Sequence, residues 1–220
     1  MRIVGMASIM GREELLILAI NSLLPQVDKI YVGLNNYPEI PERLRSLRNV
    51  ECVILDNSLG DGAKFYSIKD INDAMYFSCD DDLAYPAGYC DYMESKVRQY
   101  NSIVSLHGRR FDRRPIVSYR KSFSLNYHCL HTYHEDVQLH VGGTGVMTFD
   151  TNRFKPDISQ FKEKNMCDIW IAKQASEQGI PIMGVAHKNT YLRYLNPVGT
   201  IWRDCKIDPY QTGILKSFMK

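Results

Sequence analysis

The sequence lacks any uninterrupted apolar run of about 18 residues, which is the length a helix needs to cross a membrane. Its N-terminal apolar run is broken by Arg12, Glu13 and Glu14, which argues against a signal peptide. The six cysteines are scattered without CxxC spacing, as is typical of free, buried thiols in a reducing compartment. These absences predict a cytoplasmic protein, with the inner surface of a membrane as the alternative location.

A strong charge of one sign is also absent. The net charge of +2 is too small to predict nucleic-acid binding, and we expect none. A length of 220 residues, with 45% hydrophobic and 24% charged side chains, fits one globular domain with a sizeable core. No repeat, low-complexity tract or linker divides the chain, so we expect a single domain over residues 1–220.

Short apolar runs alternate with helical patterns through the first half of the chain. Residues 11–24 and 42–47 have helical patterns, and the strands expected around them cover residues 2–7, 29–34, 50–55 and 74–78. This order predicts an α/β fold with a mostly parallel central sheet flanked by helices. The second half is expected to contain a helix over 87–100, a strand over 103–106, hairpin and loop over 108–140, a Gly-rich turn entering a strand over 141–149, a helix over 168–179 and a final strand over 182–185.

Three consecutive carboxylates, Asp80, Asp81 and Asp82, directly follow the fourth predicted strand. In open α/β sheets, ligands bind beyond the carboxyl ends of the strands. Adjacent carboxylates repel one another unless a cation offsets them, and oxygen ligands suit Mg²⁺ or Mn²⁺. A nucleoside diphosphate would complete the coordination of such an ion. The alternative is a solvated acidic turn that caps the following helix.

The sequence resembles the GT-A glycosyltransferases, in particular the bacterial family 2-like members, over residues 1–195. The segments that carry the resemblance are Met6–Ser8 with Gly11–Glu13, 56–65 (DNSLGDGAKF), 76–82 (YFSCDDD), 141–149, Asp168-Ile169-Trp170 and His187. The resemblance implies a Rossmann-like GT-A fold. Its nucleotide-sugar-binding half would cover 1–106 and its acceptor and catalytic half 107–195, with a C-terminal tail over 196–220.

The resemblance implies a metal site at the acidic run. Asp82 and Asp80 would bind Mn²⁺ or Mg²⁺, and the ion would bind the donor diphosphate. His187 would be a further ligand, with an ordinary surface imidazole as the alternative. Asp80 would contact the ribose or share the metal, and Asp81 would touch the donor sugar or the ribose.

The resemblance also implies a set of donor-binding residues. Ala7, Ser8 and Asn35 would border the nucleoside, Asp56 would bind the base, Lys64 would pair with phosphate and Gly143 would shape the floor of the sugar pocket. The alternatives are a turn cap for Asp56, a solvated side chain for Lys64 and a simple tight turn for Gly143. The GGTG segment around Gly143 lacks the GK[ST] ending of a phosphate loop, which excludes that motif.

Asp168 begins a predicted helix, where a carboxylate commonly caps exposed amide groups. The resemblance implies instead that Asp168 is the general base for the acceptor hydroxyl. The sequence offers no evident second carboxylate as a nucleophile, so inversion is preferred to retention.

The middle of the chain is basic and rich in histidine. Residues 108–121 hold six basic side chains against one acid, which favours an anionic acceptor or its lipid pyrophosphate over a plain solvated face. The cluster of His128, Cys129, His131, His134 and His140 does not match a zinc-finger spacing, so zinc is not expected there. The neighbouring Tyr127 and Tyr133 suit sugar stacking instead.

The prediction is therefore a metal-dependent, inverting glycosyltransferase that moves a sugar from a UDP-sugar to a glycan or lipid-linked acceptor in bacterial surface polysaccharide synthesis. A homo-oligomer or another polypeptide would complete the acceptor site, because the chain is short. The apolar C-terminal residues 201–202 and 214–218 either touch a membrane or partner or, as preferred, pack onto the domain.

Two alternatives remain open. One is a non-catalytic nucleotide-sugar or carbohydrate-binding protein. The other is a sugar nucleotidyltransferase, although the segment GMASIMGRE after the first strand is poor in the glycine that such an enzyme needs. A DxD phosphatase is disfavoured because the acidic run follows the fourth strand and not the first.

Overall fold

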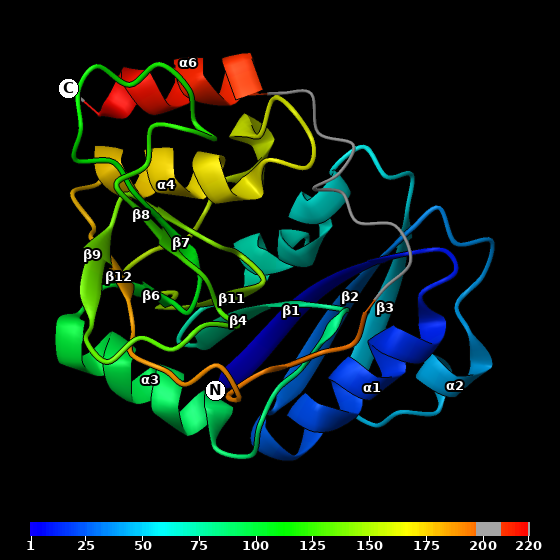
Figure 1. Ribbon diagram of the computed structural model, residues 1–220. Coiled ribbons are helices and arrows are strands. Elements are labelled where there is room, and N and C mark those ends of the chain that lie inside the picture. Colours follow the sequence, from blue (N-terminus) through cyan, green and yellow to red (C-terminus); the bar gives the residue numbers. More distant parts are fainter. Residues whose placement is uncertain (197–207, 220) are drawn as a thin grey trace.

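The computed structural model describes residues 1–196 and 208–219. Its centre is an eight-stranded sheet in the order β3-β2-β1-β4-β11-β6-β12-β9 (Figure 1). The strands are β1 (Arg2–Ile9), β2 (Lys29–Asn35), β3 (Val50–Leu55), β4 (Met75–Asp80), β6 (Ile103–Ser105), β9 (Val137–Leu139), β11 (Val146–Asp150) and β12 (Ile182–Gly184). Among the described residues, four of its seven neighbouring pairs are parallel, which confirms the predicted mostly parallel α/β sheet.

Two smaller sheets lie beside the central one. The first joins three short strands of the region predicted as hairpin, loop and glycine turn: β7 (Gly108–Arg110), β8 (Leu125–Tyr127) and β10 (Val141–Gly142). The second pairs β5 (Leu83–Ala84) with β13 (Arg193–Tyr194). The prediction that the strand at 182–185 is the last one is therefore wrong, because β13 returns to pair with the residues after the acidic run.

Helices cover both faces of the sheet (Figure 1). They are α1 (Glu13–Leu23), α2 (Glu42–Arg45), α3 (Tyr89–Tyr100), α4 (Cys167–Glu177) and α6 (Asp208–Phe218), with the 3₁₀ segments η1 (Leu24–Gln26), η2 (Gly60–Phe65), η3 (Ile68–Asp70) and η4 (Ile158–Gln160). The helical pattern over residues 11–24 predicts one buried face with Leu16, Ile20, Leu23 and Leu24. The first three are buried in α1, whereas Leu24 begins η1 and is partly buried. Pro25 lies in η1, directly after this helix.

Each face of the sheet has its own hydrophobic core, because side chains alternate along a strand. In β1, Val4 and Met6 join the core under α1 and α3, while Ile3 joins the core that contains η2, α4 and α6 residues. Burying each such aliphatic side chain contributes about 1.5–3 kcal/mol. Two cores of this kind fix the sheet between its helices and hold its strand ends in place.

The register of the parallel strands places their carboxyl ends side by side. Ala7 of β1 lies opposite Asp80 of β4, and Ile9 lies opposite Asn35 of β2. Asn35 in turn lies opposite Leu55, the last residue of β3. One edge of the sheet therefore gathers residues that are far apart in the sequence.

The C-terminal helix α6 packs beside α4 (Figure 1). Leu215 is fully buried, and Ile214 and Phe218 pack against the same core. The preferred interpretation of this segment, packing onto the domain, is confirmed for these residues, whereas Ile201 and Trp202 lie outside the described residues. Within the described chain, the helices are too short or too polar to span a bilayer.

The cysteines of the described chain are all unpaired. Cys52 is half-buried, and Cys79, Cys90, Cys129 and Cys167 are buried, as expected for free thiols. Cys205 lies outside the described residues.

The packing of α6 can be tested at Leu215. Leu215→Ala removes buried methyl groups and should lower the free energy of unfolding by about 2–5 kcal/mol, measured by urea denaturation. Ser217→Ala is the control, since the Ser217 side chain is exposed and only donates to the Ile214 carbonyl oxygen at 2.7 Å. Equal stabilities of the two variants would contradict the docking of α6 onto the domain.

Candidate active site at the carboxyl ends of the parallel strands

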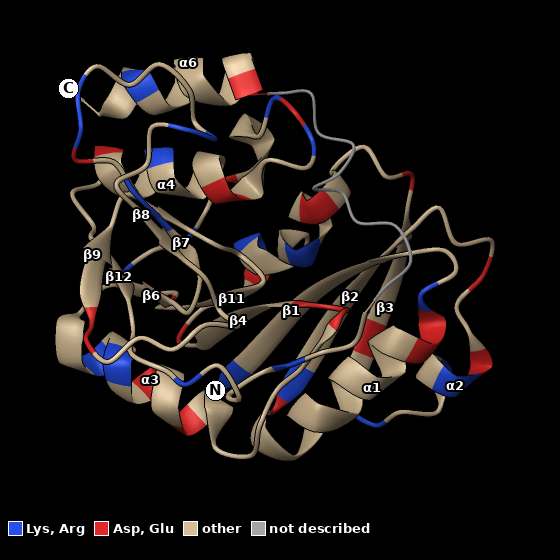
Figure 2. Ribbon diagram, in the orientation of Figure 1, with Lys and Arg blue, Asp and Glu red and all other residues tan. Residues whose placement is uncertain are grey.

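The acidic run lies at the tip of β4 (Figure 2), and its three carboxylates have different surroundings. Asp80 forms an ion pair with Lys64, yet 42% of its side chain is exposed. Asp81 is buried and accepts hydrogen bonds from Ser8 Oγ at 2.6 Å and Arg12 Nη1 at 3.0 Å. Asp82 Oδ2 lies 3.9 Å from the same Arg12 nitrogen.

The crowding of these carboxylates affects the pKa of the Asp82 side chain. Burial, followed by the negative charges of Asp80 and Asp81, raises the pKa of Asp82 to about 7. Arg12 and Lys64 oppose this increase without cancelling it. A divalent cation would offset the repulsion between these crowded carboxylates, and carboxylate oxygens are ligands that hard cations prefer. The alternative of a solvated capping turn does not describe the run, because Asp81 is buried and α3 is preceded by Gly88 without a side-chain cap.

Lys64 lies inside the molecule rather than in solvent, so the alternative of a solvated lysine is wrong. Its ammonium is paired with Asp80 and is also close enough to Asp61 for that carboxylate to act on it. Burial alone would lower the pKa of Lys64, but the charges of Asp80 and Asp61 help to raise it above the usual value. Lys64 therefore stays charged in a buried position.

Asp61 is a second, partly buried acid beside Lys64. Its Oδ2 accepts hydrogen bonds from the Cys167 thiol at 2.7 Å and from the Cys167 amide at 3.2 Å. Burial raises the pKa of Asp61 to about 6, against the opposing effects of Lys64 and Cys167. Asp61 therefore links η2 to the start of α4.

Asp168 lies in the first turn of α4 but does not cap it. The cap residue is Met166, without a side-chain hydrogen bond, so the capping alternative is wrong. Asp168 Oδ1 instead accepts hydrogen bonds from Thr144 N at 2.8 Å and Thr144 Oγ1 at 2.7 Å. Burial raises the pKa of Asp168, the Thr144 bonds and Lys64 lower it, and the charge of Asp80 raises it. Asp168 and Asp80 therefore lie within electrostatic reach of each other.

Two glycines of the GGTG segment allow close approaches at this edge. A Cβ atom at Gly145 would lie 1.9 Å from Asp80 Oδ2, and one at Gly143 would lie 2.8 Å from His107 Cβ. A side chain at either position would displace its neighbour. Between them, Thr144 provides both donors to Asp168. The segment is therefore part of the site's framework, and the role of Gly143 toward a sugar stays a prediction.

The predicted nucleoside-binding residues lie along the same edge, at the ends of β1, β2 and β3. Ala7 pairs in register with Asp80, and Ser8 is buried against Asp81. The Asn35 side chain donates to the Gly60 carbonyl oxygen at 2.9 Å, and its own Oδ1 is buried without a described partner. Asp56 accepts a turn hydrogen bond from Ser58 N at 3.0 Å, as its capping alternative expects, and its bonds to Ser58 lower its pKa.

His187 is buried, with 6% exposure, so the alternative of a surface imidazole is wrong. Its Nδ1 lies 2.7 Å from the Val185 carbonyl oxygen, and its ring packs against the stacked rings of Tyr127 and Tyr133. In the described chain, His107, His128 and Cys129 form the one trio of metal-ligating side chains with ligand atoms within 4.8 Å of one another. Asp80, Asp82 and His187 are not gathered to that distance, and their joint ligation stays a prediction.

The basic stretch 108–121 is partly folded into the protein. Arg109 is buried, with its guanidinium 4.5 Å from the Tyr119 ring centroid, and Arg110 pairs with Asp112 at 2.8 Å. These residues do not form a simple solvated face. Binding of an anionic acceptor by this stretch stays a prediction.

Arg12, Asp61 and Thr144 are the site residues that sequence reasoning did not select. Each stood inside a segment that supports the resemblance, but their partners come from distant parts of the chain. Arg12 follows the end of β1 closely in the sequence. Because ligand sites in α/β sheets lie beyond the carboxyl ends of the strands, the sequence could have predicted Arg12 as a site residue. Asp61 and Thr144 carried no comparable signal, because their roles depend on contacts with Cys167 and Asp168.

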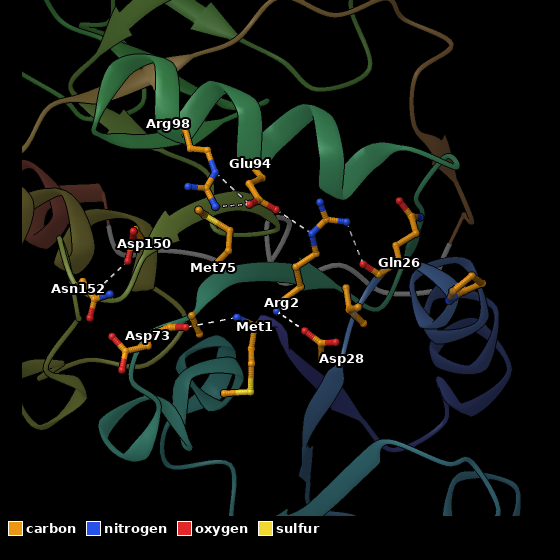
Figure 3. A pocket seen from close by; sticks show the side chains of 13 residues that line it. Met1, Arg2, Gln26, Asp28, Asp73, Met75, Glu94, Arg98, Asp150 and Asn152 are labelled. Carbon is orange, nitrogen blue, oxygen red and sulfur yellow. Dashed lines mark hydrogen bonds and ion pairs between the residues drawn. The ribbon is translucent and has the colours of Figure 1, made fainter.

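A cavity of about 670 Å³ lies at the first residues of β1 and β4, whereas the acidic run follows the last residues of β4. Figure 3 shows the side chains that line this cavity. Its lining side chains are largely paired with one another: Arg2 Nε donates to Glu94 at 2.7 Å and Arg2 Nη1 reaches the Gln26 carbonyl oxygen at 3.4 Å. Because these bonds tie β1 to η1 and α3, we interpret the cavity as structural.

Comparison with solved structures identifies the fold. Residues 1–349 of S. aureus TarS in complex with UDP-GlcNAc share 13% identity and a TM-score of 0.57, covering 98% of this chain and 64% of that one. A second structure of TarS 1–349 gives 16% identity, a TM-score of 0.53 and coverages of 85% and 58%. TarS is a GT-A-type glycosyltransferase, so the chain has the GT-A fold predicted from its sequence. The chain spans about three fifths of these structures, and no protein-family model or curated protein matches it.

The raised pKa of Asp61 predicts how the free energy of unfolding depends on pH. Its folded pKa of about 6 exceeds the ordinary 3.8, so the folded chain holds a proton between those values that the unfolded chain releases. The contribution of Asp61 to the free energy of unfolding is therefore lost as pH rises through about 6. Asp61→Asn keeps an acceptor for Cys167 and should raise that free energy by about 2 kcal/mol near pH ~7.5 and by about half as much near pH ~5.

The measurement is urea denaturation of both proteins at the two pH values. Asp56→Asn is the control, because the Asp56 side chain is exposed and its lowered pKa keeps it ionised throughout this range. An effect of Asp61→Asn that is equal at both pH values would show that the pKa of Asp61 is not raised in the folded protein.

Proposed function

We propose that the chain is a nucleotide-sugar-dependent glycosyltransferase, which moves a sugar from a UDP-sugar to an acceptor hydroxyl. The observation that carries this proposal is the gathering of Asp80, Asp82 and Asp168 around the buried ammonium of Lys64, at the strand edge of a GT-A fold. Brought to this edge by three different segments, these groups provide a site for a diphosphate and a separate carboxylate for proton transfer.

The donor would lie along the carboxyl ends of β1, β2 and β3. Ala7, Ser8 and Asn35 would border the nucleoside, and Asp56 would exchange its turn bond to Ser58 for the base. The position of these residues at neighbouring strand ends supports this placement. UDP is the proposed nucleotide because the TarS structure was solved with UDP-GlcNAc.

Mn²⁺ or Mg²⁺ would be held by Asp80 and Asp82, with His187 as a further ligand, and the donor set of carboxylates fits a hard cation. When bound, such an ion neutralises the charge that develops on the departing nucleoside diphosphate. Asp81 has a different part, because Ser8 and Arg12 already engage its carboxylate. Asp81 would hold the acidic run in place, and it would also touch the donor sugar or the ribose.

Asp168 would act as the general base. Its Oδ1 is engaged by both Thr144 donors, which fixes the direction of the carboxylate. The pKa raised by burial makes Asp168 a stronger base than an exposed aspartate. The acceptor hydroxyl would lose its proton to Asp168 while its oxygen bonds to the anomeric carbon and the bond to the diphosphate oxygen breaks. A single carboxylate in this role supports inversion.

The acceptor is proposed to be a glycan or lipid-linked sugar of bacterial surface polysaccharide synthesis, used in the cytoplasm or at the inner membrane surface. The stretch 108–121, with Gly143 at the pocket floor, would recognise an anionic part of it. A second copy of the chain or another polypeptide is proposed to complete the acceptor site.

A thermal-shift screen of nucleotide sugars in Mn²⁺ and in EDTA tests the proposal. A UDP-sugar at 100 times its dissociation constant should stabilise the folded protein by about 2.7 kcal/mol in Mn²⁺, and much less in EDTA. Release of UDP in the presence of an acceptor separates a transferase from a non-catalytic binding protein. Release of pyrophosphate from UTP and a sugar phosphate would identify a nucleotidyltransferase instead.

Asp82→Ala should remove metal-dependent donor binding, because it deletes the half-buried carboxylate with the most strongly raised pKa of the run. We expect UDP affinity in Mn²⁺ to fall by at least tenfold in calorimetry, to the value measured in EDTA. Asp70→Ala, which changes an exposed aspartate outside the site, is the control and should bind normally. Unchanged affinity in Asp82→Ala would refute the metal assignment.

Asp168→Asn should separate binding from transfer. The amide can still accept the Thr144 bonds but cannot take a proton, so donor affinity should be retained while turnover falls by about 10²–10⁴-fold. Thr144→Ser keeps the hydroxyl donor and should keep most of the turnover. Full turnover by Asp168→Asn in a UDP-release assay would rule out Asp168 as the base.

A further inference from the structure

We propose that His107, His128 and Cys129 form a second metal site, for a zinc-class cation, which lies near the acidic run but uses different ligands. The ligating atoms of these three side chains lie within 4.8 Å of one another. Two imidazoles and a thiolate are donors that select Zn²⁺ over Mg²⁺ or Mn²⁺. The sequence argued against zinc because the His128 cluster lacks a finger spacing, but the fold adds His107 from the segment between β6 and β7.

The geometry needs only local adjustment to bind an ion. Tetrahedral zinc with bonds of about 2.0–2.3 Å places its ligand atoms about 3.5 Å apart, and in this structure the three atoms lie within 4.8 Å of one another. The two imidazole rings already meet edge to face, with centroids 4.9 Å apart. His107 Nδ1 accepts from Cys129 N at 3.4 Å and His128 Nδ1 from Leu130 N at 3.2 Å. Coordination would replace these long bonds with metal bonds.

The surrounding contacts hold the trio in position, as the outer contacts of metal sites do. The His107 carbonyl oxygen accepts from Gly143 N and Ser105 Oγ, both at 2.8 Å. The His128 amide donates to the Tyr133 hydroxyl at 3.0 Å. Both sides of the trio are therefore fixed by neighbours that do not ligate, and the bare Cα of Gly143 leaves space for the His107 ring.

The trio is also accessible and close to the candidate active site. Cys129 is buried while the two histidines are partly exposed, so an ion can enter and keep a fourth position for water. Gly143 packs against His107, and the next residue, Thr144, binds Asp168. A bound ion would tie the residues after β8 to this part of the site's framework.

The test is a cobalt titration of protein first stripped with EDTA. Co²⁺ should bind at one ion per chain and give a thiolate-to-cobalt charge-transfer band that Zn²⁺ abolishes by displacement. Cys129→Ser should lose the band, and His107→Ala should bind Co²⁺ at least about tenfold more weakly. Two controls, Cys52→Ser at a half-buried cysteine of β3 and His134→Ala at an exposed histidine, should behave like the unchanged protein.

The outcome is independent of the proposed function. Asp82→Ala and an excess of Mn²⁺ should both leave the band unchanged, because the acidic run uses oxygen ligands. X-ray absorption of the zinc-loaded unchanged protein should show one sulfur and two imidazole ligands, which keeps the test valid if a variant fails to fold. Absence of the band, its survival in Cys129→Ser, its loss in Asp82→Ala or a zinc shell without sulfur would each overturn the proposal.

Discussion

The buried ammonium of Lys64 is the charge on which the candidate site depends. It pairs with Asp80, and it lowers the pKa of Asp61 and of Asp168, both of which burial alone would raise further. Because the Lys64 ammonium is buried, removing the carboxylates beside it would leave an uncompensated charge inside the protein. One cation therefore allows carboxylates from η2, β4 and α4 to be close together in a poorly solvated place.

This arrangement needs the parallel strand order. β1 and β4 are neighbours and end at the same edge, so Ser8 and Arg12 can hold Asp81 while Asp80 faces Lys64. The antiparallel strand β11 then returns beside β4, and the turn before it brings Gly145 against Asp80. The two hydrophobic cores on opposite faces of the sheet hold these strands in place. The polar groups at the strand ends are therefore held in fixed positions as well.

The sequence predicted the parts of the fold that local pattern determines. The strand over 50–55 was predicted with its observed limits, and the helix over 168–179 was displaced by one or two residues, because apolar periodicity and glycine ends mark such elements. The place of the acidic run after β4 also followed from pattern alone. The capping role of Asp168, the surface position of His187 and the solvent exposure of Lys64 were weighed as alternatives that only tertiary contacts could decide. Asp61 acts through Cys167, 106 residues away, Thr144 through Asp168, 24 residues away, and His107 through Cys129, 22 residues away. No local spacing records such contacts.

The most direct test of a nucleotide-sugar site at this edge is a crystal structure of the chain with UDP and Mn²⁺, including the anomalous signal of manganese. We predict a manganese peak beside Asp82, bridged to the diphosphate, with the uridine along the ends of β1, β2 and β3. Nucleotide density at any other place, or manganese bound at His107, His128 and Cys129 with the acidic run empty, would contradict it.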